Sequence, residues 1–229
     1  MTSFYTHLLS AREIAESTVE YILQRPDGFA FQAGQHVNLK LQQLNHEDKK
    51  GLRRTFTIAS APYEESIHIV TRDTGSGFKR TLREGVQTVE MLGPLGKLTR
   101  DPNVPAVFIA GGVGITPFRS MVLDSLHNEV AAPMTLLYSN RAVESAVFLP
   151  LFQELAANDQ YRFTLHFLQT GGETGQRIDG AFIRANVTRF DEAIFYLCGP
   201  QGMVEAMRDI LKNMEVVDER VRFEFFWGY

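Results

Sequence analysis

The residues best suited to chemistry form a glycine-rich turn in the middle of the chain. An apolar run that ends at Ile109 is followed by Gly-Gly-Val-Gly at residues 111–114 and then by Thr-Pro. Such a run is typical of a buried parallel strand, and threonine and proline suit the N-cap and first residue of a helix. A phosphate can approach bare glycine backbone at a helix start. We therefore favour a pyrophosphate site at Gly111, Gly112 and Gly114 over an ordinary strand–helix corner.

A second glycine turn follows a later apolar run. Residues 193–197 are apolar, and Cys198, Gly199 and Pro200 come directly after them. If both runs are strands of one parallel sheet, both turns lie at its carboxyl edge, where such sheets bind ligands. Two adjacent turns fit a long ligand with phosphates at one end and a reactive group at the other. A small buried residue at a strand end is the alternative interpretation of Cys198.

Polar residues after a third apolar run suit a nucleotide. Ser139 and Arg141 follow the run that begins at Met134. A hydroxyl and a guanidinium at this place in a nucleotide-binding sheet suit a ribose 2′-phosphate. For Arg141 by itself, a solvated loop is an equally good interpretation.

Two segments of the N-terminal part could hold a planar ligand that carries phosphates. In a strand, Arg54 and Phe56 share one face, and Thr57 lies on the other. A cation, an aromatic ring and a hydroxyl could hold a phosphate, stack on a ring and hydrogen-bond a ring nitrogen, although this composition is common in strands. The glycine turn at residues 75–82 opens a short basic helix and is another candidate phosphate site.

These residues lie in two parts of the chain that differ in their pattern of predicted strands and helices. Residues 1–100 consist of short alternating segments separated by turn signals, which predicts a closed antiparallel β-barrel. Strand-like and helix-like segments alternate in residues 101–229, which predicts an α/β domain with a parallel sheet covered on both faces. We therefore expect two domains with a boundary near residues 97–103, and an exposed polar loop at residues 42–51.

Composition argues against several classes of protein. Hydrophobic residues make up 44% and charged residues 22% of the chain, and a net charge of −4 gives no reason to expect nucleic-acid binding. No apolar run approaches the roughly 20 residues of a membrane span, and the start of the chain does not resemble a signal peptide. Because Cys198 is the single cysteine, we expect a cytoplasmic protein without an iron–sulfur cluster. The spacing of the histidines predicts no metal site.

Four motifs in order resemble one known family over nearly the whole chain. They are Arg-Thr-Phe-Thr-Ile-Ala-Ser at residues 54–60, Gly-Pro-Leu-Gly at 93–96, Ala-Gly-Gly-Val-Gly-Ile-Thr-Pro at 110–117 and Leu-Cys-Gly-Pro-Gln-Gly-Met at 197–203. This series is similar to the ferredoxin–NADP reductase superfamily, whose pattern is Arg-x-Tyr/Phe-Ser/Thr, Gly-x-Gly-x-x-Pro and Cys-Gly-Pro. Compact bacterial flavodoxin or ferredoxin reductases, without a fused iron–sulfur or haem domain, are the nearest likeness.

The resemblance implies a flavin, usually FAD, on the N-terminal domain. Arg54 would contact the flavin phosphates, Phe56 would pack against the isoalloxazine ring, and Thr57 would hydrogen-bond near its N5 atom. The other implied flavin contacts are Ile69, Gly77, Phe78, Lys79 and one aromatic residue of the tail, namely Tyr229, Trp227 or Phe225. The sequence departs from the family at Arg80, where a hydroxyl residue is usual, so FMN stays an alternative.

The resemblance also implies NAD(P)H on the C-terminal domain. The residues that match the nicotinamide-nucleotide turn of the family are Gly112, Gly114, Thr116 and Pro117. Cys198, followed by Gly199 and Pro200, matches the residue beside the nicotinamide, and Glu224 matches an acidic residue that assists. The predicted reaction is hydride transfer from C4 of the dihydronicotinamide to N5 of the flavin. Thr57, Cys198 and Glu224 are the candidate catalytic residues, and the 2′-phosphate interpretation of Ser139 and Arg141 favours NADPH over NADH.

With no cluster in the chain, the electrons must pass to a separate acceptor. The resemblance implies ferredoxin, flavodoxin or an oxygenase component. A basic rim around the flavin could steer an acidic partner. Its candidate residues are Lys49, Lys50, Arg53, Lys79, Arg80 and Arg83, although a solvated face explains Lys49 and Lys50 equally well.

Three other functions remain open at this point. The first is a free-flavin or ferric reductase with a small diffusible acceptor. The second is a sensing subunit that binds flavin and nucleotide but turns over little. The third is a protein that binds another nucleotide without any flavin. Bleaching of a bound yellow chromophore by NADPH or NADH separates a reductase from the other two classes.

Overall fold

The N-terminal part is built from short antiparallel strands whose apolar residues alternate. The computed structural model describes residues 2–85, 88–172 and 175–226. The elements here are β1 (Ser3–Thr6), β2 (Leu8–Ala15), β3 (Thr18–Gln24), β4 (His36–Lys40), β5 (Arg53–Thr57), β6 (Ser66–Arg72), α1 (Gly77–Arg83) and β7 (Val89–Leu95). In β4, Val37 and Leu39 are buried while His36, Asn38 and Lys40 are half-buried, as alternation requires.

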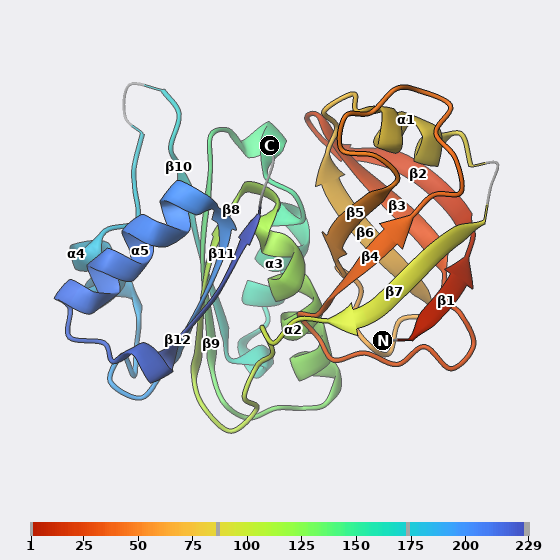
Figure 1. Ribbon diagram of the computed structural model, residues 1–229. Coiled ribbons are helices and arrows are strands. Elements are labelled where there is room, and N and C mark those ends of the chain that lie inside the picture. The colour runs from red at the N-terminus through yellow and green to blue at the C-terminus, as the bar shows by residue number, and fades with distance from the viewer. Residues whose placement is uncertain (1, 86–87, 173–174, 227–229) are drawn as a thin grey trace.

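These strands form two antiparallel sheets around one core. Their orders are β1-β7-β4-β5 and β2-β3-β6, and an isolated bridge between Ile58 and Ile69 connects the two sheets. Buried side chains from both sheets meet in one cluster with Phe78 and Leu82 of α1. Figure 1 shows α1 at one end of the two sheets. The antiparallel strands agree with the sequence prediction. The closed barrel is not shown, because the pairings of the described residues form two sheets and not one continuous ring.

The C-terminal part is a parallel sheet with helices between its strands. Its elements are β8 (Ala106–Gly111), η1 (Gly112–Ile115), α2 (Thr116–His127), β9 (Met134–Asn140), η2 (Val143–Ser145), α3 (Leu149–Ala156), η3 (Asp159–Tyr161), β10 (Phe163–Gln169), α4 (Gly180–Asn186), β11 (Ile194–Pro200), α5 (Gln201–Asn213), η4 (Asp218–Arg220) and β12 (Val221–Phe226). The sheet order is β10-β9-β8-β11-β12, and every pairing is parallel. The alternation of strand-like and helix-like segments predicted this sheet correctly.

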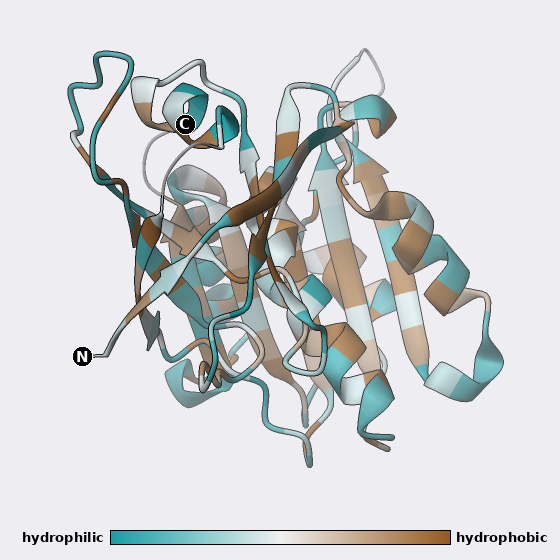
Figure 2. Ribbon diagram, turned by 90° about the vertical axis from the view of Figure 1, so that its right-hand side faces the viewer, coloured by the Kyte–Doolittle hydropathy of each residue, from teal (hydrophilic) through white to brown (hydrophobic). Residues whose placement is uncertain are grey.

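Helices cover both faces of the parallel sheet, as the wholly buried strand β8 requires. Phe108 packs on the face that α2 and α3 cover, whereas Val107 and Ile109 pack on the face that α4 and α5 cover. Figure 2 shows hydrophobic residues along the middle of the strands and hydrophilic residues in the loops. Within the described part of the chain, no helix has both the length and the apolar character needed to span a bilayer.

Helix α2 joins the two parts of the molecule. The Arg119 guanidinium donates to both carboxylate oxygens of Glu64, at 2.8 and 3.0 Å, and to the carbonyl of Ala59 at 2.8 Å. The hydroxyl of Ser120 donates to the carbonyl of Ser60 at 2.7 Å. Both acceptor carbonyls lie just beyond β5, so these contacts fix the end of β5 against the parallel sheet.

Candidate functional site

A cleft of about 400 Å³ lies between the two parts of the molecule. Phe56 and Thr57 of β5 line it from the N-terminal part, together with Lys79 of α1. Val113 of the glycine turn and Phe226 at the end of β12 line it from the C-terminal part. The cleft therefore combines an aromatic ring, a hydroxyl and a cation with the carboxyl edge of a parallel sheet, where such sheets bind ligands.

The first glycine turn folds as a short 3₁₀ helix between β8 and α2. Gly112 has a φ of +56°, and nothing lies within 4 Å of the position that its Cβ would occupy, so its backbone is open. Thr116 is the first residue of α2 and not its N-cap, a position held by Ile115. Its hydroxyl donates to the carbonyl of Val113 at 3.0 Å and therefore stabilises the turn itself. Pro117 lies in the first turn of α2, where its missing N–H is tolerated.

The second glycine turn lies directly beside the first. Cys198 is aligned with Ala110 in the β8–β11 pairing. A Cβ on Gly114 would lie 2.2 Å from the carbonyl oxygen of Cys198, and one on Gly199 would lie 3.1 Å from that of Gly111. The glycine at position 114 is therefore required for packing of the two turns, and a ligand is not needed to explain it. Pro200 is exposed at the start of α5.

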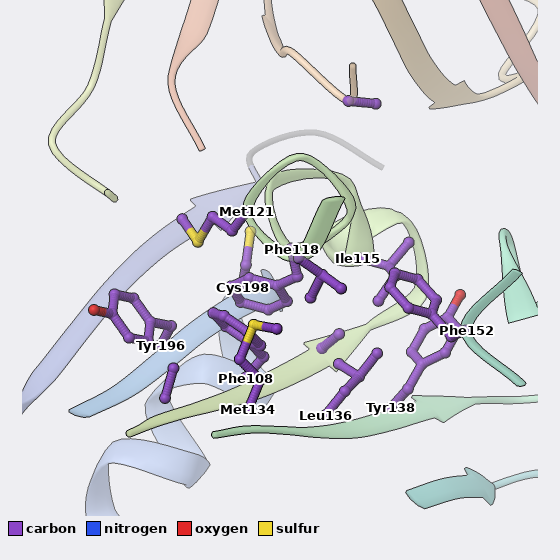
Figure 3. Packing of buried hydrophobic residues seen from close by; sticks show 14 of the residues in the cluster. Phe108, Ile115, Phe118, Met121, Met134, Leu136, Tyr138, Phe152, Tyr196 and Cys198 are labelled. Atoms are coloured by element: carbon purple, nitrogen blue, oxygen red, sulfur yellow. The ribbon is translucent and has the colours of Figure 1, made fainter. Parts of the chain in front are cut away.

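Cys198 itself is fully buried, among Phe118 and Met121 (Figure 3). Burial raises the pKa of its thiol well above the usual value, and the nearby Glu224 carboxylate raises it further. The side chain is therefore an uncharged thiol inside the core at neutral pH. This placement agrees with the alternative interpretation of Cys198 as a small buried residue at a strand end.

Glu224 links the two parts of the molecule at the other side of Cys198. It is aligned with Cys198 in the β11–β12 pairing. Its Oε1 lies 3.1 Å from Nδ1 of His36 on β4, and both side chains are about three-quarters buried. His36 had no role in the sequence prediction because only the fold brings it to Glu224.

The C-terminal aromatic residues occupy different places. Phe226 lines the cleft, although it was not among the three aromatics predicted to cover a flavin. Phe225 packs on the far face of the sheet, with the core that α5 covers. Trp227 and Tyr229 lie outside the described residues. Ile69 is likewise buried in the core of the N-terminal part, and its neighbours Val70 and Thr71 line the cleft in its place.

Arg54 and Lys79 bring positive charge to the cleft. The guanidinium carbon of Arg54 lies 5.2 Å from the ring centroid of Phe78, which contacts Phe56 at 6.0 Å. Lys79 is only 9% exposed, and its ammonium donates to the carbonyl of Arg72 at 2.5 Å. Burial lowers the pKa of Lys79 to about 8. Both cations also line the cleft and could hold phosphate groups there.

The loop at residues 42–51 is mostly exposed, as predicted, but part of it folds onto α1. A Cβ on Gly77 would lie 2.3 Å from the carbonyl oxygen of Glu47 and 2.4 Å from that of His46. Asp48 accepts a hydrogen bond from the backbone N–H of Phe78 at 2.8 Å and forms an ion pair with Arg54. The backbone of Gly77 and Phe78 is therefore occupied by this loop. The sequence contained no local signal for Asp48, which sits among other charged residues.

The predicted ribose site lies at the end of β9. Arg141 is exposed, and its carbonyl accepts the N–H of Gly171 at 3.0 Å, while the hydroxyl of Ser139 donates to Ala110 at 3.3 Å. Between them, the buried Asn140 donates to the hydroxyl of Tyr138 at 2.9 Å, and that hydroxyl donates to the carbonyl of Gly112 at 3.3 Å. The end of β9 is thus tied to the first glycine turn by two residues that sequence reasoning missed.

The arrangement fits a flavin and a nicotinamide nucleotide in chemical terms. Phe56 and Thr57 offer an aromatic surface and a hydroxyl for a planar ring, and two cations lie at the same cleft for its phosphates. The first glycine turn, with its open backbone at Gly112, faces the same cleft through Val113.

Comparisons with known proteins agree with this geometry. Residues 108–209 match the family described as "Oxidoreductase NAD-binding domain". The chain is 30% identical to a ferredoxin–NADP reductase B of Sorangium cellulosum, with 92% of this chain and 91% of that protein covered. It is 27% identical to one of the subunits of the 1,2-phenylacetyl-CoA epoxidase of Escherichia coli, with 99% of this chain and 68% of that protein covered.

The fold also matches a solved structure. The flavohem-like FAD/NAD-binding domain of a nitric oxide dioxygenase from Vibrio cholerae superposes with a TM-score of 0.82 at 18% identity. The match covers 97% of this chain and 98% of that domain. At this level of identity the likeness concerns the fold alone.

Proposed function

The chain belongs to the ferredoxin–NADP reductase superfamily, and from this premise we propose which cofactors, acceptor and residues it uses. It is an NAD(P)H-dependent flavoprotein oxidoreductase. We propose FAD as its flavin, held by residues 1–100, and NADPH as its reductant, held by residues 101–229. The observation that carries the proposal is the shared cleft, to which Phe56 and Thr57 contribute from one part and Val113 and Phe226 from the other.

The chain's own side chains have distinct tasks in this proposal. When bound, the flavin supplies the redox chemistry, since it accepts a hydride from the nicotinamide and releases electrons to an acceptor. Phe56 packs against its ring system, the hydroxyl of Thr57 orients the edge of the ring, and Arg54 and Lys79 hold the phosphates. The protein contributes mainly by fixing the position of one ring relative to the other.

On the other side of the cleft, the glycine turns hold the nucleotide. Gly112 offers an open backbone to its pyrophosphate, and the turn at Cys198 and Gly199 bounds the space for the nicotinamide. Since the thiol of Cys198 is buried and uncharged, we assign it a packing role and give the nearby carboxylate of Glu224 the polar role at this end. Ser139 and the exposed Arg141 would contact the 2′-phosphate of NADPH.

We propose a protein as the electron acceptor. The names of the two relatives, a ferredoxin–NADP reductase and a component of an epoxidase, support ferredoxin or an oxygenase component, and flavodoxin stays a candidate from the resemblance of the motifs. Of the six cations of the predicted rim, Lys49, Lys50, Arg53 and Arg80 are exposed and suited to steering an acidic partner. The other two are engaged, since Lys79 is buried and Arg83 pairs with Asp73 at 2.7 Å.

Anaerobic stopped-flow spectroscopy tests the proposal. The flavin-loaded protein is mixed with NADPH or NADH, and the reduced protein is then mixed with ferredoxin, flavodoxin, free flavin or ferric complexes. We expect rapid bleaching, faster with NADPH, and reoxidation by a protein acceptor. Reoxidation by free flavin or ferric complexes alone would replace the protein acceptor with a small one. Nucleotide binding without bleaching would favour a sensing subunit instead of a reductase.

A further inference from the structure

The loop at residues 45–51 places a carboxylate of the chain inside the cleft that the proposed function gives to the flavin phosphates. We propose that Asp48 is a displaceable substitute for those phosphates, so that it sets how tightly the site holds phosphate-bearing flavins. This inference rests on the proposed function. It assigns to Asp48 a specificity role that neither the motifs nor the comparisons indicate.

Three donors surround the Asp48 carboxylate. One oxygen accepts the backbone N–H of Phe78 at 2.8 Å, and the other accepts the N–H of Lys50 at 2.9 Å and pairs with the Arg54 guanidinium. The side chain of Asp48 is only 5% exposed, and that of Arg54 only 14%. A guanidinium and converging backbone N–H groups are the donors with which proteins bind phosphate. Asp48 therefore occupies a built anion site.

The ionisation of Asp48 agrees with this geometry. Burial opposes the charged form, but the hydrogen bonds from Phe78, Lys50 and Arg54 outweigh it and lower the pKa of the carboxyl. Asp48 is therefore a carboxylate at neutral pH. Lys49, Lys50 and Lys79 line the same cleft as Arg54, so the cleft lining holds four positive charges and the single negative charge of Asp48. This excess of positive charge would favour a diphosphate, which brings more negative charge than one carboxylate.

Hydrogen bonds at both ends of the loop would keep it attached to the protein if the Asp48 carboxylate moved out of the anion site. The backbone N–H of Asn45 donates to the hydroxyl of Thr81 at 3.0 Å, and its side chain donates to Glu84 at 2.6 Å. At the other end, the N–H of Leu41 donates to the carbonyl of Leu52 at 3.0 Å. These contacts do not involve the Asp48 carboxylate, so they can hold the loop while the carboxylate leaves.

Two anions cannot share these donors. A phosphate bound to Arg54 and the N–H of Phe78 would face the Asp48 carboxylate at close range, where like charges repel strongly. The phosphates must therefore displace Asp48, and this displacement weakens binding of FAD and FMN. Riboflavin has no phosphate and does not need to displace it. The sign of the mutational effect tests this displacement: if Asp48 stayed in place and oriented Arg54 for the phosphates, Asp48→Asn would weaken binding of FAD and FMN.

The test compares Asp48→Asn with Glu47→Gln, a matched control that removes the same charge from an exposed neighbour on the same loop. Flavin-free protein is titrated with FAD, FMN and riboflavin, and binding is followed by quenching of flavin fluorescence. We expect Asp48→Asn to bind FAD and FMN about tenfold more tightly, the effect of one charge-assisted hydrogen bond. Riboflavin binding should not change, and the control should match the wild type.

Inorganic pyrophosphate gives a second readout that needs no flavin. In calorimetry of the flavin-free protein, we expect pyrophosphate to bind more tightly to Asp48→Asn than to the wild type. Equal or weaker binding of FAD and pyrophosphate by Asp48→Asn would overturn the inference and leave the proposed function intact. If the wild type binds no flavin of any kind, the proposed function fails instead.

Discussion

Among the candidate phosphate contacts, Lys79 is the cation whose charged form is most clearly destabilised by burial. Lys79 is 9% exposed, and its ammonium donates to the carbonyl oxygen of Arg72 and, at 3.4 Å, to the hydroxyl of Thr74. Neither hydrogen-bond partner carries a negative charge, and the carboxylates of Asp73 and Asp48 offset only part of the effect of burial on its pKa. A bound phosphate would add a negative charge. The charged Lys79 would therefore be stabilised in the flavin-loaded protein, whereas it lowers the stability of the flavin-free protein.

The buried Lys79 predicts a pH dependence of stability. Burial lowers its pKa to about 8 in the folded protein, whereas it is about 10.4 in an unfolded chain. Between these values the unfolded chain binds the extra proton, so stability rises with pH, and below about pH 8 both states are protonated. We expect the flavin-free wild type to gain roughly 3 kcal/mol relative to Lys79→Met across this window. Urea unfolding at pH 7 and pH 10 measures it, and the exposed Lys97→Met provides the control. A constant difference between wild type and Lys79→Met would contradict the expectation.

Arg141 predicts the choice of nucleotide. Its side chain is exposed, while its carbonyl is fixed by Gly171. We expect Arg141→Ala to weaken NADPH binding by about 1.5–3 kcal/mol, the value of a hydrogen bond to a charged group, and to leave NADH binding unchanged. Calorimetric titration with both nucleotides measures the difference, with the exposed Arg162→Ala at the opposite end of the sheet as control. Equal losses for the two nucleotides would remove Arg141 from the 2′-phosphate site.

At the scale of elements, the sequence predicted those strands and helices whose ends are set by nearby residues. The strand–glycine–proline order around residues 109–117 predicted β8 and α2, because glycine and proline restrict the backbone wherever they occur. The N-cap was misplaced by one residue, since the turn forms a 3₁₀ helix first. Asp48 and Phe226 could not be predicted as cleft residues, because long-range contacts alone bring them there.

Helix α2 carries the contact that sets the two parts against each other. Arg119 is 11% and Glu64 20% exposed, so both charges are largely removed from water. We expect Arg119→Met to lower the free energy of unfolding by roughly 3 kcal/mol, because Glu64 is left buried without its partner. Adding Glu64→Gln should recover part of that loss, as coupled residues do. Urea unfolding measures both variants.

A matched control for this prediction lies on the surface. Arg189 pairs with Glu192, and both side chains are about half exposed. Because exposed pairs contribute little, Arg189→Met should change stability far less than Arg119→Met does. If Arg119→Met changed stability as little as Arg189→Met, the contact between the two parts would not depend on the Arg119–Glu64 ion pair.

At the scale of the whole molecule, the distribution of charge matters more for docking of a partner than the net charge does. The chain carries a net charge of −4, yet Lys49, Lys50, Arg53 and Arg80 are all exposed in the N-terminal part. A local positive patch on a negative protein can orient an acidic partner during approach. These residues lie on the loop at residues 42–51, on β5 and on α1, which all contribute side chains to the cleft, so an oriented partner would arrive beside the cleft that we propose for the flavin.

Reversing charge in this patch should slow electron transfer to an acidic protein acceptor. Arg53 and Arg80 are exposed, and neither lines the cleft, so Arg53→Glu with Arg80→Glu changes the patch without removing a cleft side chain. We expect the second-order rate of reoxidation by ferredoxin or flavodoxin to fall about tenfold at low ionic strength, and the difference to vanish in about 0.5 M salt, where charges are screened within a few ångströms. Reoxidation by the small acceptor ferricyanide should not slow, because it needs no docking. A rate that is unaffected at low salt would place the docking surface elsewhere on the molecule.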